Sequence, residues 1–193
     1  MESFPSSGSR MWRIDTRLYL GDYHSGLDAL SGVERPVEPE GALAPFAAVV
    51  SLCPMPLFSD EPVTGPASPL TEWLQVPILD GGNGEQEFET ALGVILPFVR
   101  RKQAEGNVLV HCAAGLSRSV AVVAAYLCEH GLGVEPALRH VARSKAGALY
   151  PGSPDPDDLI APAWEFRACL TRLYGGSSGL EQGVQREPLT NGR

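Results

Sequence analysis

Residues 107–127 read NVLVHCAAGLSRSVAVVAAYL, and this stretch decides the fold. Its unbroken Val-Leu-Val run is typical of a strand that is covered on both faces. A short loop that contains Gly115 follows, and residues 119–129 are apolar nearly all round. Such a segment is expected to be a central helix packed on every side. The stretch therefore predicts a buried strand, a tight loop and a core helix.

The rest of the chain supplies further strands and helices around this unit. Short apolar runs predict strands at 17–20, 47–52, 73–78 and 107–110. Apolar residues at helical spacing predict helices around 88–99, 134–141 and 166–173, the last capped by Asp158 with Pro162 in its first turn. Alternating strands and helices predict an α/β fold with a central, mostly parallel or mixed sheet of four to five strands flanked by helices.

The length of 193 residues suits one well-buried core. We expect a flexible N-terminal arm at 1–10, one domain at 11–174 and a disordered Gly- and Ser-rich tail at 175–193. Residues 54–71 contain five prolines, so this segment is predicted to be a long loop rather than a helix.

Charge and cysteine usage exclude several classes of protein. The net charge is −8 with no basic run, which argues against nucleic acid as a partner. The N-terminus lacks the apolar core of a secretory signal and no apolar run approaches 18 residues, so we expect a cytoplasmic protein without a membrane span. The four cysteines form no CxxC pair, and neither a metal nor another cofactor is expected.

The loop at 112–118, here called the cradle loop, has the composition of an anion-binding site. Its backbone N–H groups and the N-terminal end of the following helix are expected to converge on a bound phosphate. Arg118 adds a planar fork that can hold two phosphate oxygens. The same positive field favours the thiolate form of Cys112, which would be a nucleophile aimed at phosphorus.

Taken singly, Cys112, His111 and Arg118 are more simply a buried thiol, a core histidine and a surface charge. Together they read His-Cys, two residues, Gly, two residues, Arg-Ser, a spacing that arises by chance on the order of once in ten thousand chains of this length. It also falls at a strand-to-helix junction, as a phosphate cradle requires. The joint pattern therefore indicates function.

The wording HCAAGLSRS resembles the signature of the protein tyrosine phosphatase superfamily, and most closely its dual-specificity branch. RLYLGDYHSGLDAL at 17–30 is similar to that branch's opening strand and helix, and 72–96 to its general-acid region. The resemblance implies that Cys112 forms the phosphocysteine, Ser119 assists its hydrolysis and His111 supports the thiolate. The implied phosphate-binding residues are Ala113, Ala114, Gly115, Leu116, Ser117 and Arg118.

A phosphatase of this kind needs a carboxylic acid to protonate the leaving group. Asp80 is our candidate, because it follows a predicted strand, precedes Gly81 and Gly82, and lies in the region where the family places its acid. The alternative is that Asp80 only forms a turn with these glycines. Asp60, Glu85 and Glu87 are weaker candidates for the acid.

The resemblance implies a phosphoric monoester hydrolase that acts on phosphotyrosine and on phosphoserine or phosphothreonine in proteins. Alternatives are a phosphatase of a small metabolite, phosphosugar or lipid, a catalytically weak phosphate-binding module, and a rhodanese-like sulfur carrier. The segment SKAGALYPGSPDPDDL at 144–159 departs from the branch by lacking its Asn and Gln pattern. Cys53 is either an inert core thiol or a redox partner of Cys112, as in the family's lipid-phosphatase relatives.

Overall fold

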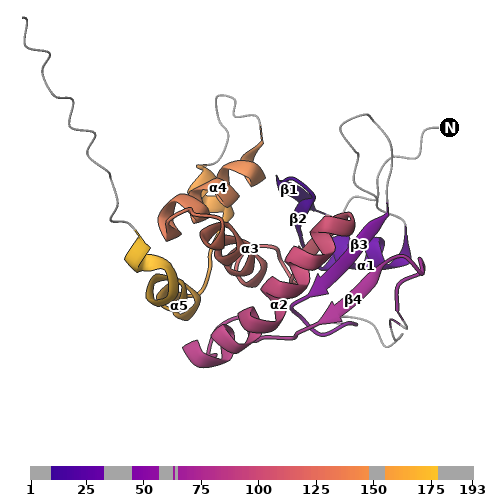
Figure 1. Cartoon of the computed structure of the whole chain (residues 1–193), viewed down its shortest axis with the longest axis horizontal. Coiled ribbons are helices and arrows are strands. Elements are labelled where there is room, and N and C mark those ends of the chain that lie inside the picture. Colours follow the sequence, from indigo (N-terminus) through magenta and orange to yellow (C-terminus); the bar gives the residue numbers. More distant parts are fainter. Residues whose placement is uncertain (1–9, 33–44, 57–62, 64, 148–154, 178–193) are drawn as a thin grey trace, which may run out of the picture.

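The computed structural model describes residues 10–32, 45–56, 63, 65–147 and 155–177, and they build one sheet with helices on both sides (Figure 1). The sheet has five strands in the order β1-β2-β5-β3-β4. Strand β1 pairs antiparallel with β2, and every other pair is parallel. The predicted single-domain α/β fold with a mixed sheet is confirmed. The strands are β1 (Met11–Asp15), β2 (Leu18–Gly21), β3 (Phe46–Ser51), β4 (Glu72–Gln75) and β5 (Asn107–His111).

The helices cover the two faces of the sheet unequally. Helix α1 (Tyr23–Ser31) packs on one face, where Tyr19, Leu30 and Leu109 share a small core. The larger core on the other face includes Leu18 and Leu20, so β2 alternates its side chains between the two faces. That second face carries α2 (Glu85–Glu105), α3 (Arg118–Glu129), α4 (Val134–Ala146) and α5 (Trp164–Tyr174), with the short 3₁₀ helices η1 (Pro156–Leu159) and η2 (Gly175–Ser177).

The register of the parallel strands brings several chain segments to one edge of the sheet. His111 at the end of β5 pairs with Gly21 on one side and with Ser51 on the other, and Ser51 pairs with Gln75. Because parallel strands end at the same edge, the residues that follow these four positions meet there. This edge is where open α/β sheets bind ligands.

Two strands differ from the sequence-based prediction. Strand β1 was not predicted, because only Ile14 of its five residues is buried and the strand has no clear apolar alternation. Strand β4 ends at Gln75, before Pro77, which has no N–H to donate. The chain nevertheless continues beside β3, because the Val76 N–H donates to the Ser51 carbonyl (3.0 Å) and the Ile78 N–H to the Leu52 carbonyl (3.2 Å).

The prediction that Asp158 caps the last helix is wrong. Asp158 lies inside η1, whose N-cap is Asp155, and α5 begins only at Trp164. Proline disfavours the helical conformation of the residue before it, so Pro162 keeps the chain extended up to the start of α5.

Some predictions fall on residues that the structure does not describe. The proposed arm at 1–10 and tail at 175–193 lie outside the described residues, except for Arg10 and η2. Within 54–71, the residues 57–62 and 64 also lie outside, and the others contain neither helix nor strand. No helix among the described residues has both the length and the apolar character to cross a membrane.

Candidate active site

The cradle loop lies between β5 and α3, at the sheet edge described above. The Cys112 residue is only 1% exposed. Its Sγ atom accepts a hydrogen bond from the Gly115 N–H (3.3 Å) and lies 3.2 Å from the Ser119 Oγ. The sulfur thus has two polar neighbours, a backbone N–H that donates to it and a hydroxyl that can donate or accept. The structure thus brings Cys112 and Ser119 together as the sequence predicted.

The carbonyl groups of the cradle loop are bonded to groups outside the loop. Ala113 O accepts from the Tyr23 N–H (3.1 Å), Gly115 O from Lys145 Nζ (2.6 Å) and Leu116 O from the Ala161 N–H (2.7 Å). With these three carbonyls engaged elsewhere, backbone N–H groups of the loop other than that of Gly115, which donates to Cys112 Sγ, can face an anion.

Gly115 is required by the shape of the loop. Its φ angle is +68°, in the left-handed region that side chains disfavour. A Cβ atom there would also lie 3.1 Å from the Trp12 ring and 3.2 Å from the Gly21 carbonyl oxygen. The glycine therefore permits both the turn and the close approach of β2.

Arg118 begins α3 with its guanidinium almost completely buried. The Nη1 atom donates to two backbone carbonyls, Leu52 O (3.3 Å) and Ile78 O (3.1 Å), and Nη2 lies 3.2 Å from Asp80 Oδ2. Its Nε atom is buried without a hydrogen-bond partner among the described residues. An unsatisfied buried donor costs about 1–3 kcal/mol, and such a group calls for an explanation such as a ligand.

The acid candidate Asp80 reaches the cradle through Arg118, and its side chain is 46% exposed. Of the weaker candidates, Glu85 pairs with Arg172 (3.3 Å) and Glu87 Oε2 accepts from the Gly84 N–H (3.2 Å), so both are engaged elsewhere. Asp60 lies outside the described residues. Asp80 is the one described candidate that contacts a residue of the cradle loop.

His111 is fully buried at the end of β5 and belongs to a chain of three polar side chains. The Trp73 Nε1–H donates to Ser51 Oγ (2.9 Å), and Ser51 Oγ lies 2.6 Å from His111 Nε2. The Nδ1 atom of His111 lies 3.4 Å from the Cys112 carbonyl, and because a carbonyl oxygen can only accept, Nδ1 carries the ring proton. In the neutral ring Nε2 then accepts from the Ser51 hydroxyl.

Burial lowers the pKa of His111 from 6.5 to about 4, so the ring is neutral at physiological pH. A Cβ atom at Gly26 would lie 2.3 Å from this ring, which shows how closely α1 covers it. The histidine therefore supports the cradle as a neutral, fixed donor to the Cys112 backbone.

Lys145 of α4 lies behind the cradle loop. Besides Gly115 O, its Nζ atom donates to Leu159 O (2.5 Å), and it lies 4.4 Å from the centre of the Trp12 ring. Burial lowers the pKa of Lys145 to about 8, while the nearby Cys112 acts in the opposite direction. A buried ammonium thus ties α4 to the back of the cradle.

Cys53 follows β3 and is completely buried. Burial raises the pKa of its thiol to about 11, and Cys112 contributes to the same rise. Because Ser51 pairs with His111 across the sheet, Cys53 and Cys112 both lie just beyond paired strand ends. All four cysteines are free thiols.

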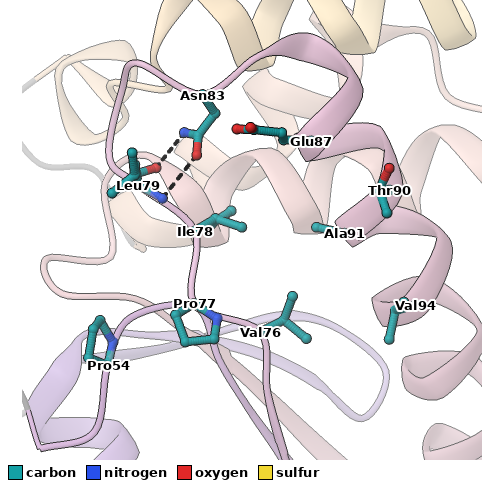
Figure 2. A pocket seen from close by; sticks show the side chains of 10 residues that line it. All are labelled: Pro54, Val76, Pro77, Ile78, Leu79, Asn83, Glu87, Thr90, Ala91 and Val94. Atoms are coloured by element: carbon teal, nitrogen blue, oxygen red, sulfur yellow. Dashed lines mark hydrogen bonds between the residues drawn. The ribbon is translucent and has the colours of Figure 1, made fainter.

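The loop that carries Asp80, residues 79–83, is here called the acid loop. Figure 2 shows its reciprocal pair, in which the Leu79 N–H donates to Asn83 Oδ1 (3.0 Å) and Asn83 Nδ2 donates to the Leu79 carbonyl (2.7 Å). The same residues line one side of an open, mostly apolar groove of about 450 Å³ against α2. At the other side of the loop, the Gly82 N–H donates to Glu165 Oε1 (2.5 Å).

Sequence reasoning missed four residues of this site, namely Ser51, Trp73, Lys145 and Glu165. A polar Ser51 inside the apolar run VVSLC was a usable signal, since buried hydroxyls need partners. Lys145 and Glu165 gave no local signal, because their partners Gly115 and Gly82 are distant in sequence.

Comparisons with known proteins agree with this geometry. Residues 63–154 match the model of the dual specificity phosphatase catalytic domain, a range that includes Asp80, Cys112 and Arg118. The chain is 42% identical over 76 residues to the tyrosine-protein phosphatase yvh1 of Schizosaccharomyces pombe, covering 39% of this chain and 22% of that protein. It is 50% identical over 50 residues to dual specificity protein phosphatase 1B of Arabidopsis thaliana, covering 25% and 29%.

The matched segments thus span about a quarter of the length of these curated relatives. Among solved structures, the human tyrosine phosphatase-like serine/threonine/tyrosine-interacting protein is similar with a TM-score of 0.59. It is 24% identical, and the match covers 86% of this chain and 95% of that one, so the likeness concerns the fold. The cradle loop, the sheet and these matches together show that residues 63–154 are similar to the catalytic domain of dual specificity phosphatases.

Proposed function

We propose that this protein hydrolyses phosphate monoesters through a phosphocysteine on Cys112, and that its substrates carry phosphotyrosine, phosphoserine or phosphothreonine. The observation that carries the proposal is the buried Nε of Arg118, which has no hydrogen-bond partner among the described residues and belongs to the loop that begins at the buried Cys112. A phosphate oxygen would satisfy that donor while the cradle N–H groups hold the remaining oxygens.

In the first step the Cys112 thiolate attacks phosphorus, so the S–P bond forms as the ester P–O bond breaks. The departing oxygen takes a proton from the Asp80 carboxylic acid, which becomes a carboxylate. Asp80 must leave its ion pair with Arg118 to do this, and its half-exposed side chain leaves room for that movement.

In the second step a water oxygen attacks phosphorus and the S–P bond breaks. Asp80 now accepts the proton of that water, and inorganic phosphate leaves. The Ser119 hydroxyl, 3.2 Å from Sγ, donates to the sulfur as its negative charge returns. Ser119 thus assists hydrolysis of the intermediate.

Cradle composition supports a monophosphate ester over a polyphosphorylated ligand. The side chains of Ala113, Ala114, Leu116 and Ser117 are neutral, so Arg118 is the one cation of the loop. The protein's net charge of −8 also opposes highly anionic substrates at long range. We therefore place phosphoproteins before lipids or phosphosugars, and we place the enzyme in the cytoplasm, where free thiols such as Cys112 stay reduced.

Replacement of the nucleophile tests the proposal. Cys112→Ser should abolish turnover of an aryl phosphate yet still bind that ester, because Arg118 and the cradle remain. The matched control is Cys128→Ser, another buried thiol, which should keep its activity. Acid quenching of wild type during turnover should trap one phosphate on Cys112, detectable by mass spectrometry. Wild-type rates in Cys112→Ser would refute the nucleophile.

A second assay separates the substrate classes. Phosphotyrosine and phosphothreonine peptides with basic flanks should have a higher kcat/KM than trisphosphorylated inositol headgroups, and the preference should narrow at high salt. A higher kcat/KM for the headgroups at low salt would favour the lipid alternative. Vanadate binding without turnover of any ester would favour a phosphate-binding module.

A further inference from the structure

We propose that Glu165, at the start of α5, is a positioning residue that holds the acid loop in register with the cradle loop. This inference rests on the proposed function, because it assigns Glu165 a role in the delivery of a proton by Asp80. Among the described residues, Glu165 forms no hydrogen bond or ion pair with Cys112 or Arg118, so it would act through the loop.

The contact is short, and it joins a buried carboxylate to an exposed glycine. Glu165 is 2% exposed, and its Oε1 accepts from the Gly82 N–H at 2.5 Å. A Cβ atom on Gly81 would lie 3.6 Å from the same oxygen, so the carboxylate packs along two consecutive residues after Asp80. The acid is therefore followed directly by the segment that Glu165 holds.

That segment needs a restraint. Gly81 and Gly82 have φ angles of +114° and +79°, which glycine adopts readily but does not maintain by itself. The base of the loop is already tied, because Leu79 and Asn83 hydrogen-bond reciprocally (Figure 2). Glu165 supplies the second tie at the tip, so Asp80 lies between two fixed points.

The chain just before Glu165 is bonded to the cradle loop. The Ala161 N–H donates to Leu116 O (2.7 Å), and the Ala163 N–H donates to Ser117 Oγ (3.3 Å). Residues 161–165 thus contact the nucleophile's loop at one end and the acid's loop at the other. The separation of acid and nucleophile is set in part by this segment.

Burying the Glu165 carboxylate has a desolvation cost, which an apolar side chain that served packing alone would not have. Among the described residues no Lys, Arg or His forms an ion pair with Glu165, so its burial is supported by the Gly82 N–H and by the N-terminal turn of α5. A well-packed apolar side chain would avoid that cost. Compared with an apolar side chain, Glu165 provides an oxygen that accepts the hydrogen bond from the Gly82 N–H.

Two conservative variants separate reach from charge. Glu165→Gln keeps an acceptor oxygen at the same reach but is neutral, whereas Glu165→Asp keeps the charge and is one methylene shorter. We expect Glu165→Gln to retain a near-wild-type kcat/KM on phenyl phosphate. Glu165→Asp should lower kcat/KM by about 10- to 100-fold, the size of effect that a small misplacement of a catalytic group causes. On p-nitrophenyl phosphate, whose leaving group needs little protonation, both should stay within about threefold of wild type.

A double-mutant cycle completes the test. In an Asp80→Asn background, Glu165→Asp should cause no further loss on phenyl phosphate, because the acid that it positions is already absent. Glu135→Asp, in the exposed first turn of α4, is the matched control and should leave both rates unchanged.

The outcomes distinguish the two proposals. Equal loss of both substrates in Glu165→Asp, or full additivity with Asp80→Asn, would overturn the positioning role while leaving the phosphatase assignment intact. Loss in Glu165→Gln as large as in Glu165→Asp would also overturn it, since charge rather than reach would then matter. If Asp80→Asn itself shows no dependence on the leaving group, Asp80 is not the acid and the inference about Glu165 falls with it.

Discussion

The Nη2 atom of Arg118 lies 3.2 Å from the Oδ2 atom of Asp80, so the proposed phosphate-binding cation and the proposed acid form an ion pair. A phosphate oxygen and the Asp80 carboxylate are therefore alternative partners of one guanidinium. Because Asp80 is half-exposed, the pair contributes only about 0.2–1 kcal/mol. Binding of substrate can displace the carboxylate at that small cost.

Removing the charge of Asp80 should therefore strengthen anion binding. We expect Asp80→Asn to bind vanadate about 1.4- to 5-fold more tightly than wild type, the range that corresponds to about 0.2–1 kcal/mol. Inhibition constants against p-nitrophenyl phosphate would measure this. Glu87→Gln is the control, because Glu87 bonds to Gly84 and not to Arg118. Unchanged or weaker vanadate binding would count against competition for the guanidinium.

The buried His111 should make the protein less stable in acid. Its pKa is about 4 when folded and 6.5 as a free side chain, so between these values the unfolded chain binds a proton that the folded protein does not. The free energy of unfolding should fall by about 3 kcal/mol as the pH drops from 6.5 to 4, beyond the effect of carboxylates. Urea unfolding at several pH values would measure how the free energy of unfolding changes with pH. His111→Gln should remove the part of that change that is due to the histidine. Equal slopes in the two proteins would disprove the effect.

Lys145 should limit activity at alkaline pH. Its pKa is about 8, so the ammonium behind Gly115 is present below that value and is lost as the pH rises through it. We expect the wild-type kcat/KM to decline above about pH 8. Lys145→Arg should not decline there, because arginine stays protonated. Lys145→Met should be slower at every pH and lack this decline. The same alkaline decline in Lys145→Arg would show that another group titrates.

Peroxide treatment tests Cys53 as a redox partner. Peroxide would oxidise the Cys112 thiolate to a sulfenic acid, and the Cys53 thiol would then condense with it, releasing water and forming a disulfide. Burial raises the pKa of Cys53 to about 11, so disulfide formation should be slow at neutral pH and faster at higher pH. Mass spectrometry should find the Cys53–Cys112 disulfide in wild type, and only sulfinic or sulfonic Cys112 in Cys53→Ala. Finding only those acids in wild type would reject the disulfide.

Local sequence patterns predicted the elements whose environment is uniform along their length. Helix α3 is apolar nearly all round and β5 is built on an unbroken Val-Leu-Val run, so both were predicted within a residue of their observed bounds. Strand β1 escaped prediction because its place depends on pairing with β2 rather than on its own apolar pattern.

The residues of the candidate site also divide into those that the local sequence predicted and those that it did not. Cys112, Gly115, Arg118 and Ser119 lie within eight residues, so their spacing alone indicated a cradle. Asp80 was found because it follows a strand and precedes two glycines. Lys145 bonds to the backbone of Gly115, and Glu165 bonds to the backbone of Gly82. Every residue type has these backbone groups, so the sequence does not indicate which of them will be the partner.

The three tryptophans of this chain give the site a built-in set of optical reporters. Trp12 lies against the Lys145 ammonium behind the cradle, Trp73 is hydrogen-bonded to Ser51, and Trp164 is 76% exposed beside Glu165. Indole emission responds to nearby charge and solvent, so each ring would register a different event. Three variants that each keep one tryptophan should therefore report on the back of the cradle, on the hydrogen bonds of His111 and on the start of α5 as separate fluorescence signals, without any added dye.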